Sequence, residues 1–202
     1  MRTDRLWLPL LALFALASAP ALTAAERTLV LDPDATEVAF SLDATGHDVH
    51  GTLQLQRGTV TFDPEAGTAS GEIAIDATRA ETGNDKRDET MHTKVLETGT
   101  YPLFVFSPQA VEGAWTGAGS EQLRLIGTLA IHGGEHPLTM PARVTVDGDR
   151  VEAEATFEIP YVDWGMHDPS VFILRVADTV EVTVHAVGSL ETPAADDMAA
   201  EP

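Results

Sequence analysis

Apolar and polar side chains alternate along most of this 202-residue chain, in segments separated by glycine, proline and Asp-Gly turns about every 8 to 15 residues. In residues 49–56 the odd-numbered positions are apolar or glycine and the even-numbered positions are polar. Residues 180–186 repeat this pattern, with three valines and an alanine on one face. A period of two is typical of strands that are buried on one side. The sequence therefore predicts an all-β fold.

Several of these segments are long for the strands of a sandwich, so we expect a tall antiparallel barrel with about eight main strands. Strands are predicted at residues 28–31, 36–43, 49–56, 58–63, 69–77, 102–111, 121–132, 136–146, 151–160 and 178–190.

One segment and its neighbour depart from the alternation. Residues 103–106 are apolar on both faces, which predicts the lumen on one side and a covering element on the other. A helical period appears over 84–96, where Met91 and Val95 share a stripe. We expect this one short helix to cover Leu103 and Val105.

The first 25 residues resemble an export signal. Arg2 and Arg5 precede an apolar run over residues 6–17, and small residues lead to Ala25, after which we expect cleavage. The alternative is a membrane anchor, but about 12 apolar residues fall short of the ~20 that span a bilayer. This predicts a periplasmic or secreted protein with one domain over residues 26–190, followed by a disordered acidic tail over 191–202.

Charge and cysteine content exclude several classes of function. The chain has 12 Lys and Arg against 32 Asp and Glu, and it has no cysteine. Such a surface repels phosphate backbones and anionic headgroups, so we expect neither nucleic-acid binding nor stable membrane binding after cleavage. Disulfides, a cysteine nucleophile and lipidation on cysteine are all ruled out.

Several short motifs follow one another in a characteristic order. They are Val49-His-Gly, Phe62-Asp-Pro, Thr82-Gly-Asn-Asp-Lys-Arg-Asp88, Tyr101-Pro-Leu-Phe-Val-Phe-Ser107, Leu129-Ala-Ile-His-Gly133 and Asp178-Thr-Val180. In this the chain resembles the YceI-like, polyisoprenoid-binding family over residues 28–190. The resemblance implies a lipocalin-like barrel, monomeric or homodimeric, that holds an isoprenoid or quinone-like lipid in its lumen without a cofactor.

Two sets of residues are candidates for contact with such a lipid. The apolar candidates for the lumen are Phe40, Leu42, Phe104, Phe106, Phe157, Trp164 and Phe172. The alternative is that these side chains simply fill the barrel, as they do in small barrels. Arg87 and Asp88 are candidates for the headgroup, because arginine binds anions in a bidentate manner, or else they tie the helix start to its neighbours.

The chain departs from the family pattern in two places. Asp43-Ala-Thr45 stands where a histidine is common, with His47 displaced. Residues 161–170 replace a shorter stretch that contains arginine. Both places are where a headgroup would enter, so they weaken the transfer of the ligand's identity from the family.

Histidines support a second hypothesis, a periplasmic protein that binds or uses a metal. The candidates are His47, His50, His92, His132 and His136, which like His167 fall at or near predicted strand ends and turns. A metal site needs three or four such groups around one ion. A three-residue hairpin would bring His132 and His136 together. The alternative is that these histidines make ordinary hydrogen bonds in turns.

Catalysis has little support in the sequence. Ser107 or Ser170 could meet a histidine in space, but no Gly-x-Ser-x-Gly elbow, phosphate loop or dinucleotide fingerprint is present. We therefore predict a binding protein and not an enzyme.

Overall fold

The structure is a computed structural model and describes residues 26–191. Two short helical turns, α1 (Asp85–Thr90) and the π-helical η1 (Met91–Val95), separate the fourth and fifth strands. No helix within 26–191 is long and apolar enough to cross a membrane. The strands are β1 (Arg27–Leu31), β2 (Glu37–Leu42), β3 (Val49–Asp63), β4 (Thr68–Glu81), β5 (Leu103–Gly113), β6 (Gly119–Ile131), β7 (Gly134–Asp147), β8 (Arg150–Ile159) and β9 (Val180–Glu191).

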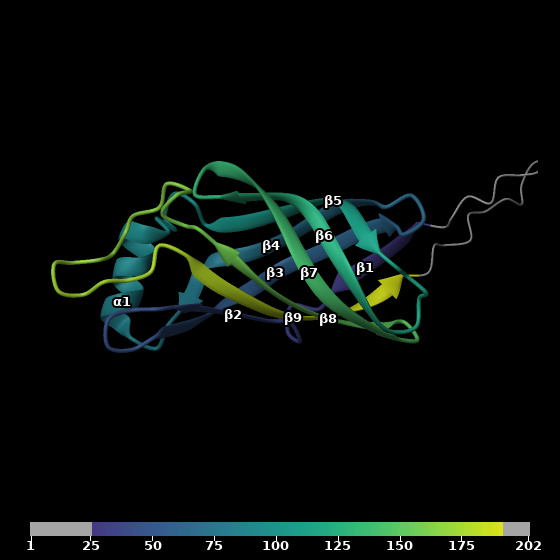
Figure 1. Cartoon of the computed structure of the whole chain (residues 1–202), viewed down its shortest axis with the longest axis horizontal. Helices are drawn as coiled ribbons and strands as arrows, with labels where there is room; N and C mark the ends of the chain where they lie inside the picture. The colour runs from purple at the N-terminus through teal and green to yellow at the C-terminus, as the bar shows by residue number, and fades with distance from the viewer. Residues whose placement is uncertain (1–25, 192–202) are drawn as a thin grey trace, which may run out of the picture.

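All strand pairs are antiparallel, and the sheet closes on itself. Each strand from β3 to β9 pairs with the next in the chain, while β1 and β2 both pair with β3 and β9. Leu29 of β1 lies opposite Val60 and Leu190, whereas Phe40 of β2 lies opposite Gly51 and Val182. Because β1 and β2 both lie between β3 and β9, together they fill the place of one strand in the barrel wall. The nine strands therefore form a barrel of eight strand positions, which is elongated, as Figure 1 shows. The predicted all-β antiparallel barrel is confirmed.

β3 corrects the prediction that residues 49–56 and 58–63 form two strands. It is one strand of 15 residues with a register shift between Leu55 and Arg57 against β4. A bulge adds one residue to a strand without ending it. Before this bulge the buried side is odd-numbered, as at Leu55, and after it the buried side is even-numbered, as at Val60. In the sequence, this switch of the buried side from odd to even positions looks like the end of one strand and the start of another, although the strand continues.

The helical segment lies where the sequence predicts it but does not cover the outer face of β5. Met91, Val95 and Leu96 pack instead against the inner core that contains Phe104. The reason is topological, because the chain must leave the rim after β4 and return to it before β5. Leu103 therefore stays partly exposed on the outside of the barrel.

The two ends of the barrel differ. At one end, which we call the closed end, Val60, Phe62 and Ala69 are buried together, and the ring of Trp115 meets Phe62 edge-on at 5.2 Å. At the other end, which we call the mouth, lie α1, η1 and the long connection from β8 to β9 (Figure 1). The predicted export signal and nearly all of the predicted tail lie outside the described residues. Glu191, assigned above to that tail, ends β9.

Candidate functional site

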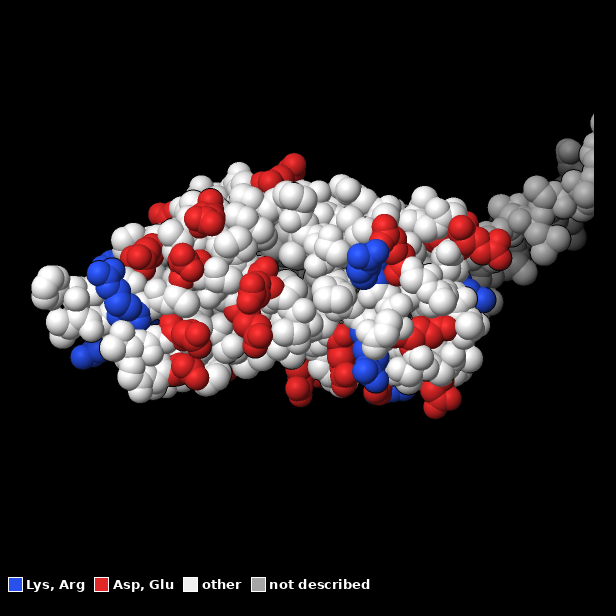
Figure 2. Space-filling model, viewed as in Figure 1, with Lys and Arg blue, Asp and Glu red and all other residues white. Residues whose placement is uncertain are grey.

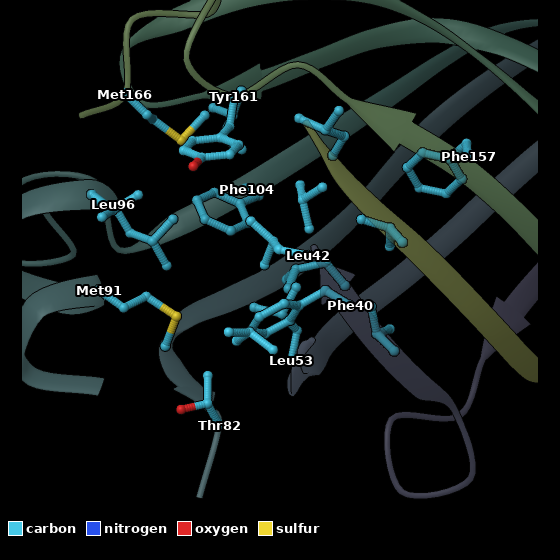
Figure 3. A pocket seen from close by; sticks show the side chains of 18 of the residues that line it. Phe40, Leu42, Leu53, Thr82, Met91, Leu96, Phe104, Phe157, Tyr161 and Met166 are labelled. Atoms are coloured by element: carbon cyan, nitrogen blue, oxygen red, sulfur yellow. The ribbon is translucent and has the colours of Figure 1, made fainter. Parts of the chain in front are cut away.

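The barrel surrounds a cavity of about 810 Å³ that extends from the mouth toward the closed end. Every strand contributes to its wall, because inward positions alternate with outward ones along each strand. Leu31, Leu55 and Ala186 line its deep part, and Met91 and Leu96 line it at the mouth. Figure 3 shows Met91 and Leu96 on one side of this space, opposite Phe104 and Leu42.

The cavity wall is apolar, although the chain is strongly acidic. Of the described residues that line it, none is an aspartate or a glutamate, and the only Lys and Arg are Arg87 and Lys94. Both cations lie on the helical segment at the mouth. The volume falls within the ~300 to 1,000 Å³ typical of small-molecule and cofactor sites. It is roughly five times the ~150 Å³ cavity that takes up one benzene ring.

Five of the seven predicted lumen residues lie on the cavity wall. They are Phe40, Leu42, Phe104, Phe106 and Phe157. All five belong to strands whose alternation directs them inward, so local sequence was enough to place them. Figure 3 shows Phe157 deeper in the barrel than Phe104.

Trp164 and Phe172 do not lie on the cavity wall, which corrects their prediction. Trp164 stacks on His136 with ring centroids 4.2 Å apart and planes 5° from parallel. The Phe172 side chain is 98% exposed. Both residues belong to the long β8–β9 connection, where no strand period fixes the direction of a side chain.

The same connection contributes wall residues that sequence reasoning missed. Tyr161 and Met166 are 4% and 3% exposed and border the cavity beside Phe104 (Figure 3). The Tyr161 hydroxyl donates a hydrogen bond of 2.8 Å to the carbonyl of Ala177. Burial, and then the negative charges of Asp168 and Asp178, raise the pKa of Tyr161 to about 12. The phenol is therefore neutral at physiological pH.

Arg87 and Asp88 hold the turn that leads from β4 into α1. Arg87 donates from Nε to the Thr82 hydroxyl at 2.7 Å and from one Nη to the Thr82 carbonyl at 2.9 Å. The Asp88 carboxylate accepts from the Thr82 backbone N–H at 3.0 Å and from the Thr82 hydroxyl. The Asn84 side chain caps α1 by accepting from the N–H of Arg87. Arg87 remains on the cavity wall, whereas Asp88 does not line it.

The predicted metal candidates are held in separate places. The imidazole of His132 bonds Glu97 at 2.8 Å and packs on the ring of Tyr101. His92 bonds the Ala80 carbonyl at 2.9 Å and the Thr98 hydroxyl at 3.3 Å. Within residues 26–191 there is no group of three or more His, Asp or Glu placed to hold a metal ion.

The β6–β7 hairpin explains why its two histidines do not form a pair. It turns on two residues, His132 and Gly133, with φ values of 50° and 77°, and not on the three predicted. His132 therefore lies in the turn itself, while His136 stands opposite Leu129 and under Trp164. Among the remaining candidates, His47 lines the cavity at the mouth and His50 is exposed on β3.

The two serines considered for catalysis have other surroundings. Ser107 is exposed on β5. The Ser170 hydroxyl accepts from the N–H of Val176 at 3.0 Å and donates to the Val176 carbonyl at 3.3 Å. Ser170 therefore closes a loop of the β8–β9 connection.

Comparison with known proteins gives a family and a shared fold. The family model for the YceI-like domain matches residues 29–188. No curated protein matches the sequence. The solved structure of BcnA from Burkholderia cenocepacia is similar, with a TM-score of 0.62 and 22% identity over 78% of this chain and 98% of that one.

Two further solved structures share the fold. A polyisoprenoid binding domain from Saccharophagus degradans, described as implicated in plant cell wall breakdown, has a TM-score of 0.62 and 16% identity over 81% of this chain and 98% of its own. The YceI protein of Campylobacter jejuni has a TM-score of 0.51 and 17% identity over 74% of this chain and 85% of its own.

Proposed function

Because the chain belongs to the family of YceI-like domains, we propose that it carries an apolar lipid of the isoprenoid or quinone class inside its barrel. The observation that carries this proposal is the cavity of about 810 Å³ with its apolar wall. The name of the similar polyisoprenoid binding domain agrees with such a ligand. The function proposed is binding and transport or storage, without catalysis.

The cavity suits a long chain with a small polar end. Each buried CH₂ group is worth about 0.8 kcal/mol, so a chain that fills most of the space would bind tightly without a single hydrogen bond. Polar wall residues such as Thr82, Arg87 and Lys94 lie at the mouth. We therefore place the hydrocarbon toward Leu55 and the headgroup near the helical segment.

We further propose that the protein is exported to the periplasm. The basic start, the short apolar run and the small residues before Glu26 support cleavage after Ala25. A strongly acidic surface would keep a carrier of apolar cargo in solution there. The test is the mass of the mature protein and its recovery in the periplasmic fraction. A mature chain that retains residue 1, or one found in the cytoplasm, contradicts this proposal.

The decisive experiment is native mass spectrometry of protein purified from its own host, followed by extraction of the ligand. We expect one apolar molecule of several hundred daltons for each barrel. Stoichiometric metal in place of lipid, or an empty cavity after gentle purification, would overturn the proposal.

Two matched substitutions on β8 test where the ligand lies. Ala155 faces the cavity, and Thr156 next to it is exposed on the outer face. We expect Ala155→Phe to expel the ligand with little loss of stability, because the new ring enters space that side chains leave empty. Thr156→Phe should retain the ligand. Equal ligand content in both variants would place the lipid elsewhere.

A further inference from the structure

The β8–β9 connection ends in an exposed apolar tip, which we define as residues Val171, Phe172, Ile173 and Leu174. Their side chains are 57%, 98%, 82% and 38% exposed, and they are the large exposed hydrophobic residues of the described chain. Reciprocal backbone hydrogen bonds between Val171 and Leu174, of 2.8 and 3.1 Å, form a tight turn with Phe172 and Ile173 at its apex. Contiguous exposed apolar clusters are typical of protein or membrane interaction sites.

The tip is supported by the loop between β2 and β3. The Arg175 carbonyl accepts from the N–H of Thr45 at 2.8 Å, and the N–H of Arg175 donates to the Thr45 hydroxyl at 3.0 Å. The N–H of Ala177 donates to the carbonyl of Asp43 at 2.8 Å. Figure 1 shows the β8–β9 connection, in yellow-green, projecting beyond α1 as the outermost part of the mouth. The apolar apex is therefore held away from the barrel.

Charge is distributed unevenly around the tip. Residues 26–191 carry 10 Lys and Arg against 28 Asp and Glu. The two long connections at the mouth, residues 82–102 and 160–179, hold four of these Lys and Arg, including both lysines of the chain, against seven Asp and Glu. Figure 2 shows basic side chains directly behind the uncharged tip, and mostly acidic side chains along the rest of that face, with a few basic ones among them toward the closed end. The mouth is therefore acidic overall, but the cations of the described residues are relatively concentrated there, and Lys94 and Arg175 lie next to the tip.

The tip is also continuous with the cavity. Val171 and Leu174 line the cavity as well as the tip, together with Lys94 from η1. A molecule that leaves the barrel along this wall would pass directly from apolar cavity residues to the apolar apex.

We propose that the tip docks the mouth onto an anionic lipid bilayer, with Phe172 and Ile173 entering the boundary between headgroups and acyl chains. Lys94 and Arg175 contact lipid phosphates beside them. The proposal rests on the proposed lipid-carrying function for its purpose, because docking opens a path for the cargo between bilayer and barrel. The acidic remainder of the surface is repelled by the same membrane, which makes the contact transient and agrees with the expected lack of stable membrane binding.

A bilayer fits this tip better than a protein partner does. Stable protein interfaces bury about 1,200 to 2,000 Å² in total, which four side chains at the end of a loop do not supply. A bilayer needs only a few inserted apolar side chains with cations at headgroup level.

Vesicle flotation of the mature protein tests the proposal. The vesicles contain phosphatidylethanolamine and phosphatidylglycerol in a ratio of 3 to 1. We expect the native protein to float with them, and Phe172→Ser combined with Ile173→Ser to lower the bound fraction at least about tenfold, since two apolar side chains no longer insert.

A matched charge comparison isolates the cations at the mouth. Lys94→Gln with Arg175→Gln removes two positive charges near the tip, and Arg124→Gln with Arg150→Gln removes two toward the closed end. Both pairs change the net charge equally. We expect only the first pair to weaken flotation, by a fewfold, because local attraction to phosphates is lost.

Docking and carrying can fail separately. Native protein that retains its lipid but does not float overturns docking and leaves the carrier function standing. Native protein that floats through its tip but never holds lipid overturns the carrier function alone. If the tip variant floats as well as the native protein, docking is wrong. Docking is equally wrong if sedimentation shows that the tip variant converts a native dimer into monomers without any vesicle binding, because the tip would then join two copies of this chain.

Discussion

The closed end and the mouth use the same kinds of side chain in opposite ways. At the closed end Phe62 is 8% exposed and meets Trp115, whereas at the mouth Phe172 is 98% exposed. The strands are joined at the closed end by short turns only, whereas at the mouth two short turns, 43–48 and 132–133, are accompanied by two connections of about 20 residues, 82–102 and 160–179. Short turns bring inward side chains together until they fill the barrel. Long connections leave an opening between them. The closed end therefore contributes stability, and the mouth gives a ligand access to the cavity.

The strongest test of this contrast compares the two phenylalanines. Phe62→Ala should lower the free energy of unfolding by about 3 to 5 kcal/mol, because a buried aromatic ring and its contact with Trp115 are lost. Phe172→Ala should change it by less than about 0.5 kcal/mol, because its ring is in solvent. Urea unfolding measures both. Equal losses would mean that the tip is part of the core.

Alkaline pH should loosen the mouth before the closed end. The pKa of Tyr161 is about 12 in the folded protein, whereas the ordinary value for tyrosine, which applies in the unfolded chain, is 10.0. Between these values the folded state keeps a proton that the unfolded state has lost, so stability falls as pH rises through this range. The full contribution, about 2 to 3 kcal/mol at most, is present below pH 10 and gone above pH 12.

Two tryptophans allow this loss to be followed at each end. Among the described residues Trp115 lies at the closed end and Trp164 at the mouth. We expect the fluorescence of Trp164, followed in a Trp115→Phe background, to change first as the pH is raised. Tyr161→Phe should remove the decline in stability, and Tyr101→Phe should retain it. A decline that survives Tyr161→Phe would assign it to another group.

Two glycines of β3 test how tightly each end is packed. A Cβ at Gly51, near the mouth, would lie 2.2 Å from Phe40 Cζ and 2.6 Å from the Glu81 carbonyl oxygen. A Cβ at Gly58, nearer the closed end, would meet the flexible end of Leu31 at 2.7 Å. Gly51→Ala should therefore cost about 1 to 3 kcal/mol and push the Phe40 ring into the cavity.

Gly58→Ala should cost less, since the Leu31 side chain can rotate. Urea unfolding and lipid content distinguish the two variants, because only Gly51→Ala should also reduce the bound lipid. If Gly58→Ala costs more stability than Gly51→Ala, the side chains near the mouth adapt to an added methyl group more easily than those nearer the closed end.

The smallest expected effect concerns the start of α1. Asn84→Ala removes the side chain that accepts from the N–H of Arg87 and should cost about 1 kcal/mol. Glu89→Ala, on the exposed face of the same helix, is the control and should be nearly neutral. If thermal unfolding shows no difference between them, the cap does not contribute to the order of the mouth.

Residues on strands were the predictable part of the candidate site. Phe104 and Phe106 are inward because they alternate with outward neighbours, and that alternation is visible locally. The stripe of Met91 and Val95 also predicted the apolar face of the helical segment correctly. It did not predict that this face packs against the inner core and not against the outer face of β5. Tyr161 could not be found in this way, because its position depends on a bond to Ala177, 16 residues further along the chain.

The sequence by itself determined the strands, their inward faces and the acidic surface, because each of these depends on a residue and its close neighbours. Only the tertiary structure decided that β1 and β2 share one position, that the bulge in β3 changes the inward phase, and that the β8–β9 connection both closes over the cavity and projects its apolar tip. These features depend on pairings between residues far apart in the chain, and loop residues acquire a direction only when those pairings fix where the loop begins and ends.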